Sequence, residues 1–346
     1  MSAPETAAAR KRAAIAVAAV AVFMALCLVV VEIVGAVAAS MGIREGVKVS
    51  YDQGAAVTDV ELPSDPFYVL LIGSDSRKGT ALYTGKSNEH AQVDQHSDIM
   101  TLLRVDPYTP QLTLVTVPRD TVLEGSDTKI NEALAADNDP LAVVAQVEKL
   151  TGVEIEYYAM TTFIGFERLV DGIGGLTIDV PVTVTVPDPS NAEDVRVTAG
   201  EDKHLDGSEA LVVARARKEY KEDEDALRQA NVRNLEEAII WKGISACLDS
   251  GSSGTTFSRM MDALLENVTT NMDSELIREL VREISAGSDH LMTIYSCTGP
   301  HEGGVDDDID LWIVEEDKQA WAELMEIVDA GGDPTSLVEV PEFPER

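Results

Sequence analysis

The sequence predicts an α/β protein of the mixed α+β kind, in which helices flank a central mixed β-sheet and a single transmembrane helix precedes the domain. Apolar runs typical of strands alternate with stretches of helical periodicity. The alternation is too irregular for repeated βαβ units, which favours a mixed sheet over a parallel one. A long apolar segment near the amino terminus supplies the membrane helix.

The strands are expected where apolar runs end at turn-forming residues. Residues 67–72 (FYVLLI) form a continuous apolar run that stops at Gly73, which is typical of a buried strand. Residues 98–105 and 112–117 follow, and DPYTPQ between them predicts a hairpin turn. Further extended segments are expected at 154–160, 176–186, 291–296 and 309–314.

The helices are expected between these strands. Residues 141–150 follow an Asp139-Pro140 start signal, and residues 163–170 are closed by DGIGG. Residues 207–214 and 225–247 also read as helices, and the second is long and amphipathic.

Residues 13–39 are apolar, with Glu32 as their only charge, and they follow the basic tripeptide Arg10-Lys11-Arg12. A helix of this length spans roughly 40 Å, more than the ~30 Å of a bilayer core. A cleaved signal peptide is the alternative, because Ala36-Val37-Ala38 is typical of a cleavage site, but signal cores are only about 7–15 residues long. We therefore expect a cytoplasmic tail (1–12), a membrane anchor (13–39), an extracellular stalk (40–65) and an extracellular domain.

The chain has 27 Lys and Arg against 61 Asp and Glu, a net charge of −34. Nucleic acid is excluded as a partner because its phosphates favour basic surfaces. For the same reason the extracellular part is not expected to lie on anionic lipid.

Two of the three cysteines, Cys247 and Cys297, lie outside the predicted anchor. We expect a disulfide between them because thiols oxidise outside the cell, and two buried free thiols are the alternative. No Cys-x-x-Cys pair or His-rich cluster is present, so a zinc site is not expected.

Charged and polar residues gather at the ends of the first three predicted strands. Two carboxylates among several cations suit a phosphate whose charge is shared between a hard metal ion and guanidinium groups. Loops at such strand ends converge on one crevice. The residues are Asp75, Arg77, Asp98, Arg119, Asp120, Lys129 and Asn131.

The second half of the chain adds Arg215 and Arg217, which would diverge by ~200° on a helix but share a face in an extended segment. If both serve one ligand, the helix must end at about Ala214. Arg228, Gln229 and Arg233 follow on the long helix, where Gln229 and Arg233 share a face. Each arginine alone is typical of a solvated ion pair worth under ~1 kcal/mol.

Taken in order, these stretches resemble the LytR-CpsA-Psr family. The resemblance covers about residues 66–245 and rests on LLIGSDSR, HSDIMTLLRVDPYTPQLTLVTVPRDT, KINEA, EYYAMTTFIGFERLVDGIGGLTIDV and HLDGSEALVVARARKEYKEDEDALRQANVRNLEEAI. It implies a catalytic domain over 66–330, with a motif core to residue 245 and a carboxyl-terminal extension over 246–330, followed by a tail (331–346). KEYKEDEDAL replaces the family's usual loop, so either Asp223 or Asp225 is expected to face the site.

The resemblance implies a Mg²⁺-dependent, membrane-anchored phosphotransferase that moves a glycopolymer from polyprenyl pyrophosphate onto a peptidoglycan hydroxyl. Carried over by position, Asp75 and Asp98 are the expected Mg²⁺ ligands, and the polyprenyl chain is expected in an apolar tunnel between sheet and helices. Asp120 either orients Arg119 or acts as a base. The expected pyrophosphate clamp is Arg119, Arg215, Arg217 and Arg228, and the expected substrate-binding residues are Arg77, Lys129, Asn131, Gln229 and Arg233, the last as a support for the clamp.

Two other functions stay open at this point. A non-catalytic module that binds polyprenyl phosphates or cell-wall sugars would share the arginines but need no metal. A lipid-pyrophosphate hydrolase would use water as the acceptor. DDDID at 306–310 lacks the glycine and closing glutamate of a calcium loop and is interpreted as a solvated acidic turn.

Overall fold

The structure is a computed structural model that describes residues 63, 65–76, 95–106, 111–135, 138–189, 193–220, 224–250, 255–273, 276, 293–306, 311–335 and 337. The predicted cytoplasmic tail, the membrane anchor, most of the stalk and Arg77 lie outside these residues. Within the described part of the chain, no helix combines the length and apolar character that crossing a bilayer requires.

The central sheet has six strands and is mixed, as the sequence predicted. Neighbouring strands β1, β2 and β3 are antiparallel, whereas β1–β5 and β3–β11 are parallel pairs. In spatial order the strands are β10 (Thr269–Thr270), β5 (Tyr157–Thr161), β1 (Phe67–Ser74), β2 (Ser97–Val105), β3 (Gln111–Thr116) and β11 (Thr293–Thr298).

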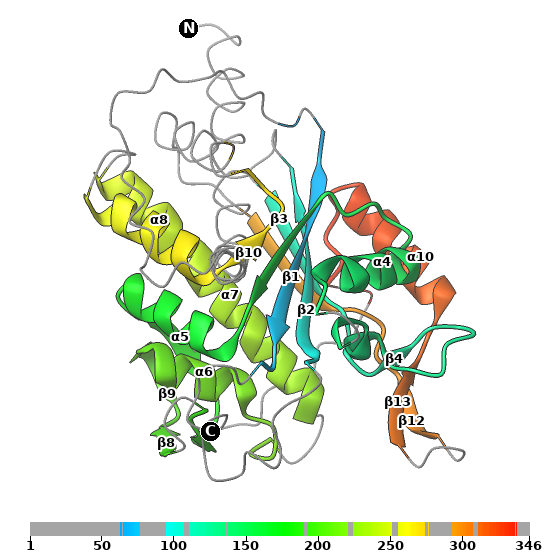
Figure 1. The fold of residues 1–346 in the computed structure, drawn as a ribbon, viewed down its shortest axis with the longest axis horizontal. Helices are drawn as coiled ribbons and strands as arrows, with labels where there is room; N and C mark the ends of the chain where they lie inside the picture. The colour runs from blue at the N-terminus through cyan, green and yellow to red at the C-terminus, as the bar shows by residue number, and fades with distance from the viewer. Residues whose placement is uncertain are drawn as a thin grey trace, which may run out of the picture.

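Helices cover both faces of this sheet (Figure 1). One face carries α4 (Pro140–Thr151) and α10 (Lys318–Asp329), which contact each other. The other side carries α5 (Phe163–Gly172), α6 (Gly207–Arg215), α7 (Glu224–Ser250) and α8 (Thr255–Asn267). The fold is therefore the three-layer arrangement expected of a mixed sheet that buries both faces.

Short elements extend the fold at its edges. The 3-10 helix η2 (Ile130–Leu134) follows β4 (Thr121–Val122), which pairs with β13 (Leu311–Glu315), and β13 pairs with β12 (Gly303–Asp306). Two antiparallel strand pairs complete the fold. They are β6 (Leu176–Val180) with β9 (Gly200–Leu205), and β7 (Val184–Pro187) with β8 (Asp194–Val197).

Capping residues define the ends of the helices, among them the predicted Asp139-Pro140 start signal. Asp139 caps α4 by accepting a hydrogen bond from the Leu141 amide, and Pro140 occupies the first turn. Gly152 ends this helix with φ of 76°, a left-handed conformation that glycine adopts without steric cost. At α6, Asp206 and Glu209 form a reciprocal capping box.

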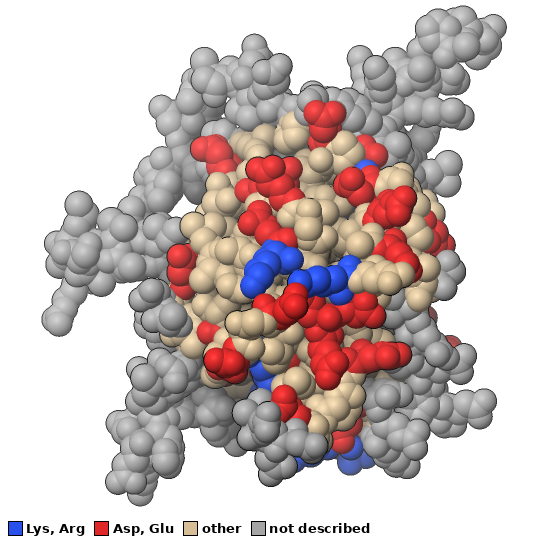
Figure 2. Space-filling view, turned by 90° about the vertical axis from the view of Figure 1, so that its right-hand side faces the viewer, with Lys and Arg blue, Asp and Glu red and all other residues tan. Residues whose placement is uncertain are grey.

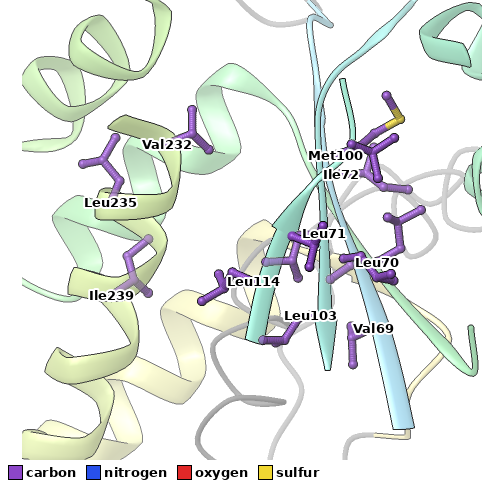
Figure 3. Close-up of a cluster of buried hydrophobic side chains, with 14 of the residues drawn as sticks. Val69, Leu70, Leu71, Ile72, Met100, Leu103, Leu114, Val232, Leu235 and Ile239 are labelled. Atoms are coloured by element: carbon purple, nitrogen blue, oxygen red, sulfur yellow. The ribbon is translucent and has the colours of Figure 1, made fainter. Parts of the chain in front are cut away.

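Part of the core lies between the sheet and α7 (Figure 3). Leu71, Leu103 and Leu114 point from the sheet towards α7, which presents Val232, Leu235 and Ile239. Leu70, Ile72 and Met100 point to the opposite face. Successive residues of β1 are thus buried on opposite faces of the sheet, which explains the continuous apolar run in the sequence.

The predicted disulfide is not formed. Cys297 is a free thiol on β11 and is fully buried, and burial raises its pKa to about 12. Cys297 lies opposite Val115 of the neighbouring strand β3, a position typical of a small apolar core residue. The side chain of Cys247 lies outside the described part of the structure.

Strands β8 and β9 were not expected from the sequence. Their side chains are mostly exposed and polar, for example Asp194, Arg196 and Glu201, so they lack the apolar alternation by which strands are recognised.

Acidic side chains spread over the face shown in Figure 2, where basic side chains form a small group near the middle. This distribution agrees with the net charge of −34.

Candidate functional site

The carboxylate of Asp225, on the first turn of α7, is the centre of a cluster of cationic and amide side chains. Arg228 Nε donates to its Oδ1 at 3.0 Å, and Gln229 Nε2 donates to its Oδ2 at 2.6 Å. The Nε atoms of Arg217 and Arg119 lie 3.4 Å and 3.7 Å from Oδ1. Asp225 therefore faces the site, whereas Asp223 lies outside the described residues.

Arg119 connects this cluster to the strand ends. It follows β3, and its Nη1 donates to Asp98 Oδ1 at 2.7 Å, while Arg228 Nη2 donates to the Asp98 carbonyl at 3.2 Å. Arg119 Nε lies 3.5 Å from Asp120 Oδ2, and Lys129 Nζ donates to Asp120 Oδ1 at 2.6 Å. The contacts of Asp120 are those of a group that orients Arg119 and Lys129.

The charges of the cluster hold one another in the ionised form. Burial would raise the pKa of Asp225, but Arg228, Arg119 and Arg217 outweigh it and lower that pKa. Burial would lower the pKa of Arg119, but Asp98, Asp225 and Asp120 raise it. Asp225 and Arg119 are therefore both charged at neutral pH.

The cluster retains hydrogen-bonding capacity for a ligand. The Nε groups of Arg119 and Arg217 and the Oε1 atom of Gln229 are buried and make no hydrogen bond within the described part of the chain. Buried polar atoms without a partner are rare in folded proteins, so such atoms at one point are typical of a binding site. Two of the three are guanidinium donors, which favours an anion.

Two cavities adjoin the cluster. An apolar cavity of about 50 Å³ lies between the sheet and α5, α6 and α7, and its lining includes Asp98 together with Phe163, Phe166 and Leu211. A polar cavity of about 500 Å³ is lined by Asp120, Arg217, Asp225 and Gln229, and by His301 and Trp312 from the carboxyl-terminal part. Asp98 and Asp225 thus belong to different cavities and are joined through Arg119.

Arg215 and Arg217 lie at different cavities. Arg215 is still helical, because α6 ends there and the next residue, Ala216, is extended with ψ of 130°. Its Nη1 donates to the Pro187 carbonyl at 2.7 Å, its Cζ lies 5.0 Å from the centre of the Phe163 ring, and it lines the apolar cavity. The helix ends at Arg215, one residue after the expected place, and the two arginines line different cavities.

Asp75 and Asp98 lie at the ends of β1 and β2, which are paired neighbours. The His96 amide donates to Asp75 Oδ1 at 2.8 Å, and the two carboxylate side chains are 20% and 30% exposed. No group of three or more His, Cys, Asp or Glu able to hold a metal occurs among the described residues. Two accessible carboxylates nevertheless fit Mg²⁺, which binds one or two carboxylates together with phosphate oxygens and water.

Arg233 and Asn131 hold together the elements that carry the site. Arg233 is 2% exposed; its Nε donates to Ser296 Oγ at 2.9 Å and its Nη1 to Thr116 Oγ1 at 2.6 Å, which ties α7 to β11 and β3. These contacts are those of a residue that supports the clamp. The Asn131 amide donates to the Arg119 carbonyl at 3.2 Å, so η2 holds the backbone of Arg119.

The comparison with protein families decides the classification. The model of the LytR-CpsA-Psr family matches residues 36–325. The chain belongs to this family.

Relatives and solved structures agree with this family. A Bacillus cereus protein named polyisoprenyl-teichoic acid–peptidoglycan teichoic acid transferase TagU is 32% identical over 61% of this chain, and the match spans 62% of that protein's length. Streptococcus mutans biofilm regulatory protein A is 28% identical over 68% of this chain and 57% of its own. The crystal structure of Bacillus subtilis TagV has a TM-score of 0.60 at 23% identity over 78% of this chain and 98% of its own. A structure of TagT bound to LIIa-WTA has a TM-score of 0.58 at 20% identity over 83% and 99%. These structural likenesses concern the fold.

Three polar or aromatic residues that line the two cavities were not nominated from the sequence: Glu236, His301 and Trp312. Glu236 lies in a long amphipathic helix rich in Glu, where a glutamate is ordinarily explained as part of a solvated face. His301 and Trp312 lie in the extension, far along the chain from the motifs. The apolar run at 309–314 with a Trp in it was the single signal available there.

Glu236 on α7 lines the apolar cavity, and neither of its carboxylate oxygens makes a hydrogen bond to a described residue. Burial raises its pKa to about 8, although the nearby Thr101 hydroxyl and Arg233 act in the opposite direction. Glu236 is therefore mostly protonated near neutral pH.

This burial predicts a pH-dependent stability. The folded protein keeps a proton that unfolded Glu236 releases above about pH 4.3, so stability falls as pH rises from there to about 8. Replacing Glu236 with Gln should remove this component, and the free-energy difference between variant and wild type should grow by at least about 1 kcal/mol between pH 5 and 8. Thermal unfolding at pH 5, 6, 7 and 8 measures it, and parallel profiles would contradict it.

Proposed function

We propose that this protein is a membrane-anchored phosphotransferase that moves a glycopolymer from a polyprenyl-pyrophosphate carrier onto a peptidoglycan hydroxyl outside the cell. The observation that carries the proposal is the Asp225-centred cluster, which lies between an apolar cavity and a polar one. Such a placement suits a substrate with a lipid end, a pyrophosphate and a sugar end. Family membership and the printed name of the Bacillus cereus relative support the same reaction class.

The cluster suits phosphoryl transfer because it offers positioned cations where negative charge develops. An acceptor hydroxyl oxygen would form a bond to the phosphorus that carries the glycan, and the bond from this phosphorus to the bridging oxygen would break. Polyprenyl phosphate leaves, and the hydroxyl proton passes to solvent. Arg119, Arg217 and Arg228 would stabilise the charge on the phosphoryl oxygens, each through charge-assisted hydrogen bonds.

Mg²⁺, held by Asp75 and Asp98 as its protein ligands, would share the charge of the pyrophosphate. The remaining assignments follow from the contacts. Asp120 orients Arg119 and Lys129, and Asp225 holds the three arginines together until the substrate arrives. The apolar cavity of about 50 Å³ is too small for a polyprenyl chain, so lipid entry requires α5, α6 or α7 to move away from the sheet.

The test is transfer by the purified full-length protein in detergent, given Mg²⁺, a polyprenyl-pyrophosphate-linked sugar and peptidoglycan oligomers. Mass spectrometry should detect a sugar-phosphate adduct on the oligomer together with polyprenyl phosphate. Release of sugar phosphate that does not depend on the oligomer would instead indicate a hydrolase. Tight lipid binding without either product would indicate a binding module.

Metal dependence is a separate prediction. Replacing Asp98 with Ala should raise the Mg²⁺ concentration needed for half-maximal transfer about tenfold, because one of two carboxylate ligands is lost. A Mg²⁺ titration of both proteins measures this. Asp262→Ala, an exposed carboxylate on α8, is the matched control and should leave the titration unchanged. Equal midpoints for Asp98→Ala and the wild type would contradict the assignment.

A further inference from the structure

The polar cavity is built partly by the carboxyl-terminal hairpin β12–β13. Strand β13 pairs in parallel with β4, so that Val314 lies opposite Thr121. The Val314 amide also donates to the Asp120 carbonyl at 2.9 Å. Asp120 follows Arg119 directly, and these hydrogen bonds therefore place the hairpin against the cationic cluster.

The segment that contains the hairpin is anchored by close packing at Gly299 and Trp321. A Cβ atom added to Gly299, just after β11, would lie 2.2 Å from the Trp321 ring on α10, and Trp321 is 1% exposed. The chain between Gly299 and Trp321 contains both His301 and the hairpin. Its two ends are thus packed together against the core.

Trp312 presents an exposed aromatic ring to this cavity. It lies two residues before Val314 on β13, so both side chains point to the same face, and both line the cavity. Val314 is buried, whereas Trp312 is 53% exposed. A large aromatic side chain left half in solvent beside a charged cluster is typical of a binding surface.

The polar lining of the same cavity offers acceptors as well as donors. Gln229 is 6% exposed and its Oε1 has no hydrogen-bond partner in the described structure, while Asp120 and Glu224 add carboxylates. His301 Nδ1 lies 3.1 Å from the Gly299 carbonyl. Because a carbonyl oxygen can only accept, Nδ1 is the donor of this hydrogen bond, which leaves Nε2 for a ligand.

This combination favours a neutral sugar over other ligands. Acceptors along the wall match hydroxyl and amide N–H donors, and the C–H face of a pyranose ring packs on an indole ring. Asp120, Glu224 and Asp225 would repel a polyanion that extended further into the cavity. The volume of about 500 Å³ is within the range of small-molecule sites.

We infer that the polar cavity is the subsite for the acceptor glycan, with Trp312 stacked on an N-acetylated amino sugar and His301 and Gln229 hydrogen-bonded to it. The inference rests on the proposed function. An in-line displacement places the attacking and leaving oxygens on opposite sides of the phosphorus. The lipid phosphate leaves on the side of the apolar cavity, so the acceptor approaches from the side of Trp312.

The experiment measures binding of peptidoglycan-derived amino-sugar oligosaccharides to full-length protein in detergent, without donor, by calorimetry. Trp312→Ala should weaken binding about tenfold and His301→Ala about threefold, whereas Trp312→Phe keeps an aromatic face and should remain within about threefold of the wild type. Trp241→Ala on α7, which removes a comparably exposed Trp, should bind like the wild type. Thermal unfolding confirms that each variant is folded.

Donor binding separates this inference from the proposed function. In the transfer assay, Trp312→Ala should raise KM for the oligosaccharide about tenfold and leave KM for the lipid donor unchanged. Absence of transfer by the wild type, with oligosaccharide binding that still depends on Trp312, would refute the reaction and support the subsite. The inference is overturned if Trp312→Ala binds oligosaccharide normally, if it weakens donor binding alone, or if the wild type binds no oligosaccharide.

Discussion

Replacing Arg119 with Ala is expected to lower the transfer rate by about 10²- to 10³-fold, the range found when a positioned charge-stabilising donor is removed. Arg119 forms ion pairs with the carboxylates of both Asp98 and Asp225. Its loss would remove a cation from the pyrophosphate and also break the ion-pair link between Asp98 and Asp225. The measurement is kcat and KM with the lipid-linked donor and peptidoglycan oligomers.

Two further variants are the controls for Arg119→Ala. Arg119→Lys retains a charge but not the forked geometry that binds Asp98 and phosphate together, so it should recover at most about a tenth of the lost rate. Arg196→Ala removes an exposed arginine from β8 and should behave like the wild type. Arg119→Ala protein that is folded and keeps more than a tenth of wild-type kcat would contradict the role of Arg119.

Replacing Asp225 with Ala should cost about 1–3 kcal/mol of folding stability when no anion is present, less than for a fully buried pair because the carboxylate is a quarter exposed. Arg119, Arg217 and Arg228 would then lie together without their shared counter-ion. The lowered pKa of Asp225 means that its contribution is complete above the unfolded value of about 3.9 and is lost as pH falls through the lower folded value. The loss is therefore expected in full at pH 7.

Inorganic pyrophosphate distinguishes this explanation from a simple packing defect. Because an anion can replace the missing carboxylate, pyrophosphate should raise the Tm of Asp225→Ala more than the Tm of the wild type. Asp225→Asn should resemble Asp225→Ala, since it keeps the size of the side chain but not its charge. If pyrophosphate raises Tm equally in all three proteins, Asp225 is not the counter-ion of the clamp.

Much of the fold could be predicted because local signals and burial agree. The runs at 67–72, 98–105 and 112–117 became β1, β2 and β3, and the Asp139-Pro140 start signal became the first turn of α4. Strands β8 and β9 escaped prediction because their exposed polar side chains carry no periodic apolar signal. The predicted disulfide was wrong because the oxidising environment outside the cell, on which the prediction rested, does not report that Cys297 is buried on β11.

The candidate site was predictable in its members more than in its arrangement. Asp98, Arg119, Arg217, Arg228 and Gln229 do meet at one place. Arg215 and Arg217 separate because the last turn of α6 includes Arg215, a difference of one residue that turns its side chain towards Phe163. Arg233 lies between α7 and the sheet, where it is hydrogen-bonded to β3 and β11, because the helix face that it shares with Gln229 continues into the core.

The sequence by itself determined the chemical kinds of groups in this protein: guanidiniums and carboxylates next to strand ends, in an order that identifies the family. These are local properties, since a strand end and its flanking residues are neighbours along the chain. The tertiary structure alone decided that one carboxylate, Asp225, gathers the arginines and that Trp312 lies beside them. Residues so distant in sequence meet through the pairing of β13 with β4 and the packing of α7 on the sheet, and such long-range contacts leave no mark on the local pattern.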